Sequence, residues 1–174
     1  MEIKKLIEIP EGIEISLGEF VTVKGPNAEL KRKLKDPMVK IEKQDNNVAV
    51  SAAKVNKKSK RIVGTTAAHI RNMICGAKAN FVYVLKICSG HFPMNISIVN
   101  NEITIRNFLG EKCPRIIKIK GNVKIKLEKE KVTIEGADIE ETGQAATMIE
   151  KLTSIKNRDR RRFQDGIFII EKPK

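Results

Sequence analysis

The chain has 174 residues, 41% of them hydrophobic, and its 34 lysines and arginines against 21 acids give a formal net charge of +13. This length allows one domain or two small ones, and the charge indicates a polyanionic partner such as nucleic acid or an anionic surface. Six phenylalanines, one tyrosine and no tryptophan argue against a protein that stacks single-stranded bases on aromatic side chains. Both halves are basic, because residues 1–80 hold 16 basic and 9 acidic side chains and residues 81–174 hold 18 and 12.

Several classes of site have no motif in the chain. The three cysteines form no CxxC pair, so neither a disulfide framework nor a zinc site is expected. No GxGxxG, Walker loop or HExxH occurs, so we expect no metal, no cofactor and no small-molecule substrate. The sequence shows neither a signal peptide nor the roughly 20 consecutive apolar residues that a membrane span needs. We therefore expect a soluble, cytoplasmic protein without membrane contacts.

The first half begins with strand patterns and ends with a helical one. Apolar and polar residues alternate over residues 3–24 and again over 39–50, which predicts strands with one buried face. A basic loop is expected from Lys54 to Arg61. Gly76 is expected to end a helix that starts near Arg61, because apolar residues recur at helical spacing at Val63, Ala67, Ile70 and Ile74.

Residues 81–88 are apolar at both odd and even positions. This pattern predicts a strand that is covered on both faces or lies between two domains. We therefore place a domain boundary just before it, near Ala79. The expected domains are residues 1–79 and residues 80–174.

Strand patterns resume in the second half. Alternating runs at 96–98 and 103–105 predict two strands, followed by a loop at 107–114. Gly121-Asn122 between two further alternating runs predicts a type II′ hairpin. The outward face of that hairpin carries four lysines: Lys118, Lys120, Lys124 and Lys126.

A second helix is expected near the end of the chain. Asp138 followed by Glu141 resembles a capping box. Gly143 is an unfavourable residue in the first turn of this helix. Its apolar stripe consists of Ala145, Ile149 and Leu152.

Three pairs of segments repeat in the same order, with spacings of 82, 84 and 78 residues. They are VTVKG at 21–25 with ITIRN at 103–107, VAV at 48–50 with VTI at 132–134, and residues 65–74 with 143–152. Each copy consists of strands and then a helix. We therefore predict an α+β fold, a tandem duplication of a two-layer unit in which a mostly antiparallel sheet packs under one helix.

Cationic residues gather in three segments, at 54–61, 115–126 and 156–162. One such run is usually a solvated face, but three of them on a chain of this net charge favour a polyanionic partner. Arginine pairs with phosphate through two parallel hydrogen bonds. Structured RNA presents phosphates and 2′-hydroxyls that can be bound without aromatic side chains, so it is the partner that fits best.

The third cationic segment is the densest. Phe163 and Ile167 are expected to anchor it to the core, and Gly166 is expected to allow the turn between them. The segment would then project four arginines within five positions: Arg158, Arg160, Arg161 and Arg162.

Six stretches, in order along nearly the whole chain, match one known family: VKGP (23–26), GTTAAHIRNMICGAKANF (64–81), HFPMN (91–95), EITIRNFLGEK (102–112), GQAA (143–146) and KNRDRRRFQDGIF (156–168). They resemble the universal large-subunit ribosomal protein numbered six in bacteria and nine in eukaryotes, in its archaeal and eukaryotic form. The resemblance implies a structural, non-catalytic protein that binds large-subunit ribosomal RNA among neighbouring ribosomal proteins. It implies a place near the stalk base, close to the sarcin–ricin loop, where translational GTPases dock.

The resemblance also implies which residues touch RNA, because the family makes its main contact with the second domain. Carried over by motif, that contact falls on Arg106, Asn107, Lys112, Lys156, Arg158, Arg160, Arg161, Arg162 and Gly166. Further candidate contacts lie in the basic segment of the first domain: Lys54, Lys57, Lys58, Lys60 and Arg61. This segment departs from the eukaryotic form, which usually carries a tryptophan pair and more residues before the first helix.

Two other functions fit parts of the sequence. An RNA chaperone or ribosome-assembly factor would need the same charge, but it would not stay with large subunits through a high-salt wash. A cysteine hydrolase would need Cys75 or Cys88 paired with His69 or His91. No local motif supports such a pair, and the cysteines stand at positions typical of buried small hydrophobic residues. We therefore expect no catalytic residue.

Overall fold

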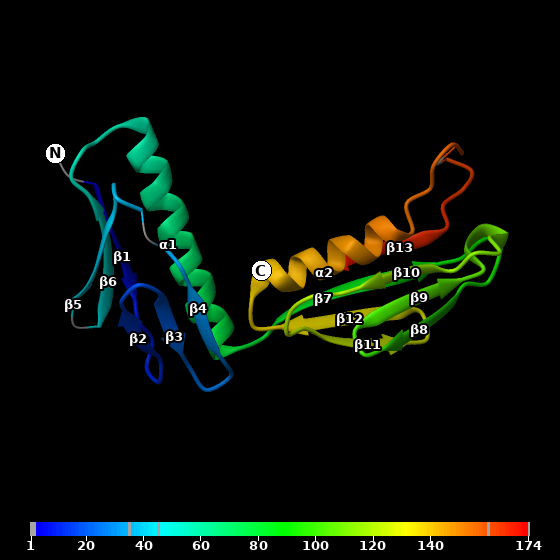
Figure 1. The fold of residues 1–174 in the computed structure, drawn as a ribbon, viewed down its shortest axis with the longest axis horizontal. Helices are drawn as coiled ribbons and strands as arrows, with labels where there is room; N and C mark the ends of the chain where they lie inside the picture. Colours follow the sequence, from blue (N-terminus) through cyan, green and yellow to red (C-terminus); the bar gives the residue numbers. More distant parts are fainter. Residues whose placement is uncertain (1–2, 35, 45, 160, 174) are drawn as a thin grey trace. The chain divides into compact units, whose positions relative to one another are not determined.

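The computed structural model describes residues 3–34, 36–44, 46–159 and 161–173 (Figure 1). The chain divides into two compact units, the first ending at Asn80 and the second beginning at Phe81. Each unit has its own hydrophobic core.

The first unit contains two small antiparallel sheets, ordered β1-β6-β5 and β2-β3-β4. The apolar stripe expected on the first helix is buried and packs against β1 and β6, which confirms that part of the prediction. The elements are β1 (Ile3–Glu8), β2 (Glu14–Leu17), β3 (Val21–Lys24), β4 (Glu29–Arg32), β5 (Lys40–Gln44), β6 (Asn47–Ala52) and α1 (Lys57–Lys78).

The second unit follows the same plan, with sheets ordered β10-β9-β8 and β11-β12-β7-β13. Helix α2 packs on β7, β12 and β13 and buries Ile149 against Leu85 and Ile134 in one core. The elements are β7 (Phe81–Cys88), β8 (Asn95–Val99), β9 (Glu102–Arg106), the 3-10 turn η1 (Phe108–Gly110), β10 (Arg115–Lys118), β11 (Lys124–Glu128), β12 (Lys131–Gly136), α2 (Ile139–Leu152) and β13 (Gly166–Glu171).

The duplication predicted from the sequence repeats is confirmed. β3 and β9, which carry the first repeated pair, are each the middle strand of a three-stranded sheet. β6 and β12, which carry the second pair, each pair with strands on both sides, and α1 and α2 follow them. The α+β class is therefore confirmed, although the strands of each copy form two sheets instead of one. Among the described residues, β13 has no counterpart in the first unit.

Helix α1 differs from the prediction at both ends. It begins at Lys57 instead of near Arg61, because Asn56 caps it: the Asn56 side chain accepts a hydrogen bond from the Ser59 amide (2.8 Å), and the Ser59 hydroxyl accepts one from the Asn56 amide (3.0 Å). Serine in the position usual for glutamate hides this capping box in the sequence. The helix also continues past Gly76 to Lys78, so most of the expected basic loop is helical and Gly76 is not its end.

The hairpin expected around Gly121-Asn122 is wrong. β10 pairs with β9 and β11 pairs with β12, so the two strands belong to different sheets. Ile119 and Val123, on either side of the turn, are both buried in the core, and the chain crosses there from one sheet to the other. The four lysines expected on one face are therefore divided, with Lys118 in β10, Lys124 and Lys126 in β11, and Lys120 between the strands.

Two further expectations are corrected in part. β7 has the expected bounds, yet neither face is buried throughout: Leu85 is buried and Ile87 on the same face is half-buried, whereas Val82 on the other face is 39% exposed. Asp138 caps α2 by accepting a hydrogen bond from the Glu140 amide (2.8 Å), but Glu141 does not complete a capping box. Its carboxylate accepts a hydrogen bond from the amide of Asn122 instead (3.3 Å).

Candidate nucleic-acid interface

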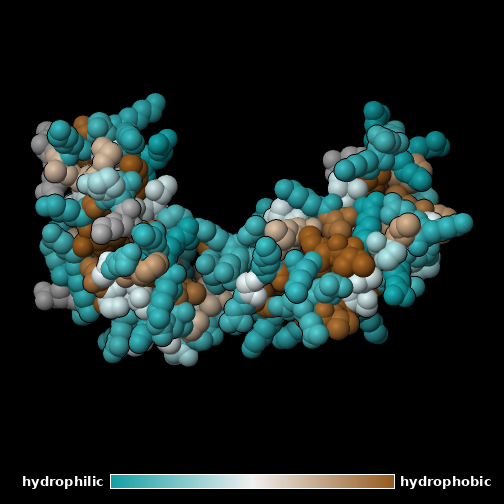
Figure 2. Space-filling model, viewed as in Figure 1, coloured by the Kyte–Doolittle hydropathy of each residue, from teal (hydrophilic) through white to brown (hydrophobic). Residues whose placement is uncertain are grey.

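Three connecting segments of the second unit form what we call the loop end: residues 89–94 after β7, residues 107–114 after β9, and the tail loop, residues 153–165, between α2 and β13. Figure 1 shows η1 and the orange tail loop at the same end of this unit. Figure 2 shows that the surface in this region is mainly hydrophilic. The loop end contains most of the motif residues that the family resemblance singled out.

Arg115 joins the segment after β9 to the tail loop. Its guanidinium donates two hydrogen bonds to the Glu111 carboxylate (2.8 and 2.6 Å) and others to the carbonyls of Leu152 (2.7 Å) and Ser154 (3.3 Å). It also lies over the ring of the buried Phe108, 4.3 Å from the centroid. One side chain therefore satisfies carbonyls at the end of α2 and fixes the position of η1 beside them.

The charges of the two segments also interact. Hydrogen bonding by Arg115 lowers the pKa of Glu111, partial burial opposes this effect, and the charges of Arg115 and of Arg158 in the tail loop lower it further. Glu111 is therefore held in its charged form by Arg115 of β10 and Arg158 of the tail loop.

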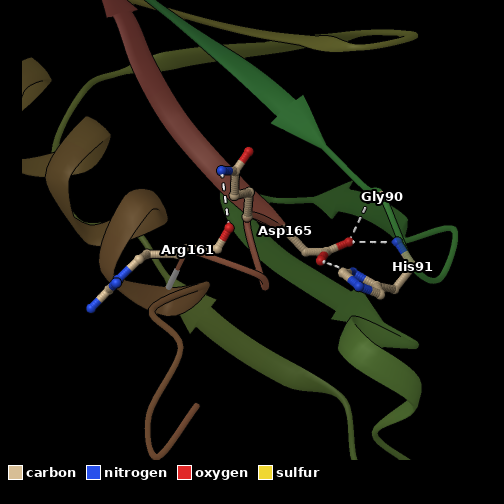
Figure 3. A network of polar contacts seen from close by, with 5 residues as sticks. Gly90, His91, Arg161 and Asp165 are labelled. Atoms are coloured by element: carbon tan, nitrogen blue, oxygen red, sulfur yellow. Dashed lines mark hydrogen bonds and ion pairs between the residues drawn. The ribbon is translucent and has the colours of Figure 1, made fainter. Parts of the chain in front are cut away.

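Asp165 joins the tail loop to the segment after β7. Its carboxylate, which is 2% exposed, accepts hydrogen bonds from the amides of Gly90 (2.6 Å) and His91 (2.9 Å), and a second oxygen meets Nδ1 of the His91 ring (2.5 Å). Burial alone would raise the pKa of Asp165, but these hydrogen bonds together hold it below its ordinary value. Figure 3 shows Gly90 and His91 converging on Asp165 while the side chain of Arg161 points away from them.

A stack of side chains supports the tail loop on its inner side. The ring of Phe163 is stacked on the ring of His91, with centroids 4.9 Å apart, and the guanidinium of Arg158 lies 4.9 Å from the Phe163 centroid. Asp159 closes a turn within the loop, accepting hydrogen bonds from the amides of Arg161 (2.9 Å) and Arg162 (3.1 Å). The loop is thus held by its own contacts as well as by its ends.

β13 fixes the end of the tail loop to the core. Ile167 is fully buried, and its amide donates to the hydroxyl of Thr153 (2.9 Å). Gly166 has a φ of +154°, and an added Cβ would lie 3.1 Å from the ring of Phe168. The expected anchor at Ile167 is therefore present, whereas Phe163 is only half-buried. Gly166 is the first residue of β13, and the turn lies earlier, at Arg161 and Arg162.

The predicted contact residues fall into two groups. Asn107 and Gly166 serve the framework: Asn107 adopts a left-handed conformation and donates to the carbonyl of Pro93 (3.1 Å), and Gly166 is buried. Arg160 lies outside the described residues. The others are exposed: Arg106 at the end of β9, and Lys112, Lys156, Arg158, Arg161 and Arg162 on the loop end.

The candidate residues of the first unit lie together around the start of α1. Lys54, Lys57, Lys58, Lys60 and Arg61 are all exposed. The first turn of α1 contains Lys57 and Lys58 and no acid. The positive end of the helix dipole disfavours lysines at this position. This arrangement fits a surface that meets a polyanion.

Sequence reasoning missed the residues that hold the loop end together. Arg115 was counted as part of a cationic face, but its charge is used inside the unit. The sequence marks His91 only as a candidate member of a nucleophile pair, and it does not single out Asp165. No local signal marks these roles, because each depends on a partner in a distant segment.

The structure also corrects the expectation that the cysteines are buried. Cys75 and Cys113 are exposed and Cys88 is half-buried. In the described part of the chain no hydrogen bond joins Cys88 to His91, whose ring is bonded to Asp165. Within the same ranges no group of three or more His, Cys, Asp or Glu side chains could hold a metal ion, and no helix is long and apolar enough to cross a membrane.

The fold and the loop end together define a class of protein: a duplicated α+β chain whose second copy presents fixed cations suited to a polyanion. The family model described as ribosomal protein L6 matches residues 9–78 and 92–166, and so it covers both copies. The chain belongs to this family.

Similar proteins from archaea match over nearly the whole length. The large ribosomal subunit protein uL6 of Methanobrevibacter smithii is 45% identical over 171 residues, 98% of this chain and 96% of that protein. The protein of the same name from Desulfurococcus amylolyticus is 47% identical over 170 residues, 95% and 92% of the two chains. That of Methanosarcina mazei is 42% identical over 172 residues, 98% of each.

Proposed function

We propose that this chain is a non-catalytic constituent of the large ribosomal subunit that binds ribosomal RNA through the loop end of its second unit. The archaeal relatives described above are large ribosomal subunit proteins, and the alignments cover 98% of this chain. Following the family resemblance, the binding site on the subunit is near the stalk base, beside the region where translational GTPases dock. Neighbouring ribosomal proteins and RNA are the partners.

One observation carries the proposal: the tail loop is fixed at its base while its cations remain available. Asp165 and Arg115 tie it to two other segments, and both ties are made within the unit. Among the described residues, Lys156, Arg158 and Arg162 form no ion pair with another side chain, and Arg161 has only a long contact of 3.8 Å with Asp159. Because the loop itself is already fixed at its base, phosphate binding has to order only its side chains, and less conformational entropy is lost.

Phosphate binding of this kind gives affinity and register and needs no reading of base sequence. The arginines provide bidentate contacts to phosphate oxygens, and the lysines provide point charges. The first unit would add a second contact surface around the start of α1. In this proposal the two copies, residues 1–79 and 80–174, are the two domains of the protein. Each domain has its own hydrophobic core.

Salt dependence of RNA binding tests the mechanism. If about six phosphates are engaged, affinity should fall roughly a thousandfold between 50 and 200 mM monovalent salt. The measurement is filter binding of the protein to an in vitro transcript of the large-subunit ribosomal RNA of Methanobrevibacter smithii. An affinity that does not change with salt would contradict phosphate binding.

A further inference from the structure

A hollow of about 600 Å³ lies beside the loop end, and the RNA-binding motifs contribute only part of its lining. It lies between the end of β7, the β11–β12 turn and the tail loop, and its charged lining is Lys86, His91, Lys129, Glu130, Arg162 and Asp165. We call it the cationic hollow.

Hydrogen bonds fix all three walls of the cationic hollow. The amide of Ile87 donates to the carbonyl of Glu130 (2.8 Å), which holds the β11–β12 turn against the end of β7. The amide of Gly90 donates to Asp165 (2.6 Å), which holds the tail loop against the segment that follows β7. The cations around the hollow therefore belong to a preformed arrangement.

The charges around the hollow are unbalanced. Lys86, Lys129 and Arg162 are exposed, and none of them forms an ion pair with another side chain in the described ranges. The carboxylate of Asp165 already accepts hydrogen bonds from Gly90 and His91, so Glu130 is the remaining acid of the lining. An anion in the hollow would meet three cations that have no ion-pair partner in the part of the chain that the structure describes.

Two local features at the edge of this hollow are unfavourable for the stability of the fold. Lys129 has a φ of +34°, a conformation that glycine or asparagine adopts with much less strain. Lys86 lies directly opposite Lys131 in the β12–β7 pair, and like charges in that relation repel each other. Local choices that oppose stability are typical of functional surfaces, and a bound anion would relieve the repulsion.

We propose that the cationic hollow binds a phosphate group of the RNA backbone through Lys86, Lys129 and Arg162. The identity of the phosphate as part of RNA rests on the proposed function above. The hollow adds two residues, Lys86 and Lys129, that lie outside every RNA-binding motif of the sequence. It extends the contact surface from the tail loop across the turn between β11 and β12.

Lys129→Asn tests the site without damaging the fold. Asparagine tolerates the left-handed conformation, so the melting temperature should stay the same or rise. Affinity for the Methanobrevibacter smithii large-subunit transcript should fall about fivefold, and the slope of log affinity against log salt should decrease by about one. Lys124→Asn is the matched control: it removes the same charge from the other end of the same hairpin, where Lys124 lies opposite Glu135. Equal effects of the two variants on affinity and slope would overturn the proposal.

A second measurement separates this proposal from the function on which it rests. Inorganic pyrophosphate, added to the full-length protein at low salt, should shift the amide resonances of Lys129 and His91 saturably, and Lys129→Asn should abolish these shifts. If pyrophosphate binds in this way but the wild type does not bind the transcript, the hollow is an anion site and the proposed function fails. If pyrophosphate leaves these amides unchanged, the hollow is not a phosphate site.

Discussion

The buried carboxylate of Asp165 accepts hydrogen bonds from both the amide and the ring of His91, which lies 74 positions earlier in the chain. The two residues close the tail loop against the segment after β7. Because Phe163 stacks on the same His91 ring, this pair supports the loop that projects the arginines.

Asp165→Asn should destabilise the second unit by about 1–3 kcal/mol, because one amide side chain cannot accept all three hydrogen bonds of a buried carboxylate. Chemical unfolding at neutral pH measures the change. Asp159→Asn in the same loop is the control: the exposed Asp159 can be replaced by an amide oxygen that still accepts from Arg161. Similar losses in the two variants would mean that the buried contacts of Asp165 stabilise the fold no more than the exposed contact of Asp159.

The stability difference between wild type and Asp165→Asn should depend on pH in one direction. Since the pKa of Asp165 is lowered in the folded chain, its contribution is complete above the unfolded pKa of about 3.9 and is lost as the pH falls through the lower folded value. The difference should therefore shrink as the pH falls below about 4. Unfolding curves of both proteins across this range check it, and a difference that grows on acidification would contradict the assigned hydrogen bonds.

Arg115→Ala should cost about 2 kcal/mol of stability or more, because it leaves two carbonyls and Glu111 without their donor and uncovers Phe108. RNA affinity should fall as well, since η1 and the tail loop lose their link. Arg115→Lys should not restore either property, because a lysine cannot reproduce the fork of the guanidinium. Arg106→Ala, at an exposed position, is the control and should leave stability nearly unchanged. If Arg115→Lys fully restored stability and affinity, the charge of Arg115 alone would matter.

Replacing Arg161 and Arg162 together by alanine should weaken RNA binding and reduce the salt slope by about two, while the melting temperature stays close to that of the wild type. Both side chains are exposed and make no contact that the core needs. Arg71→Ala with Lys78→Ala removes the same charge from α1 and should have a smaller effect on affinity. A large fall in melting temperature with unchanged affinity would assign the two arginines to structure.

Two glycines of the first unit should respond in opposite ways to alanine. At Gly25 an added Cβ would lie 2.5 Å from the carbonyl oxygen of Ala77, which is backbone and cannot easily move, so Gly25→Ala should destabilise by about 1–3 kcal/mol. At Gly64, inside α1, the nearest atom is the Lys5 Nζ at 3.9 Å. Gly64→Ala should therefore stabilise by about 0.5–1 kcal/mol. Thermal unfolding of both variants measures the contrast, and a stabilising Gly25→Ala would contradict the close approach.

The repeat, the class of the fold and the cationic tail loop could be predicted from the sequence, because these depend on local patterns. Residues with period two predict strands, and the apolar stripe of Val63 and Ile70 predicts a helix wherever it occurs. The sequence also led to the family, since motifs such as RNFLGEK are contiguous. Where a local pattern had two structural solutions, it misled: alternation on both sides of Gly121 looks the same in a hairpin and in a crossing between two sheets.

Tertiary contacts determine which segments meet at the loop end and which charges remain available there. Arg115 and Arg162 are both arginines in basic segments, yet one binds carbonyls inside the unit while the other is exposed. Likewise, Lys86 and Lys129 approach a common hollow only because β7 and the β11–β12 turn are joined by the hydrogen bond between Ile87 and Glu130. The physical reason is that a side chain's charge is neutralised or presented according to neighbours that are distant in sequence, and only folding brings those neighbours together.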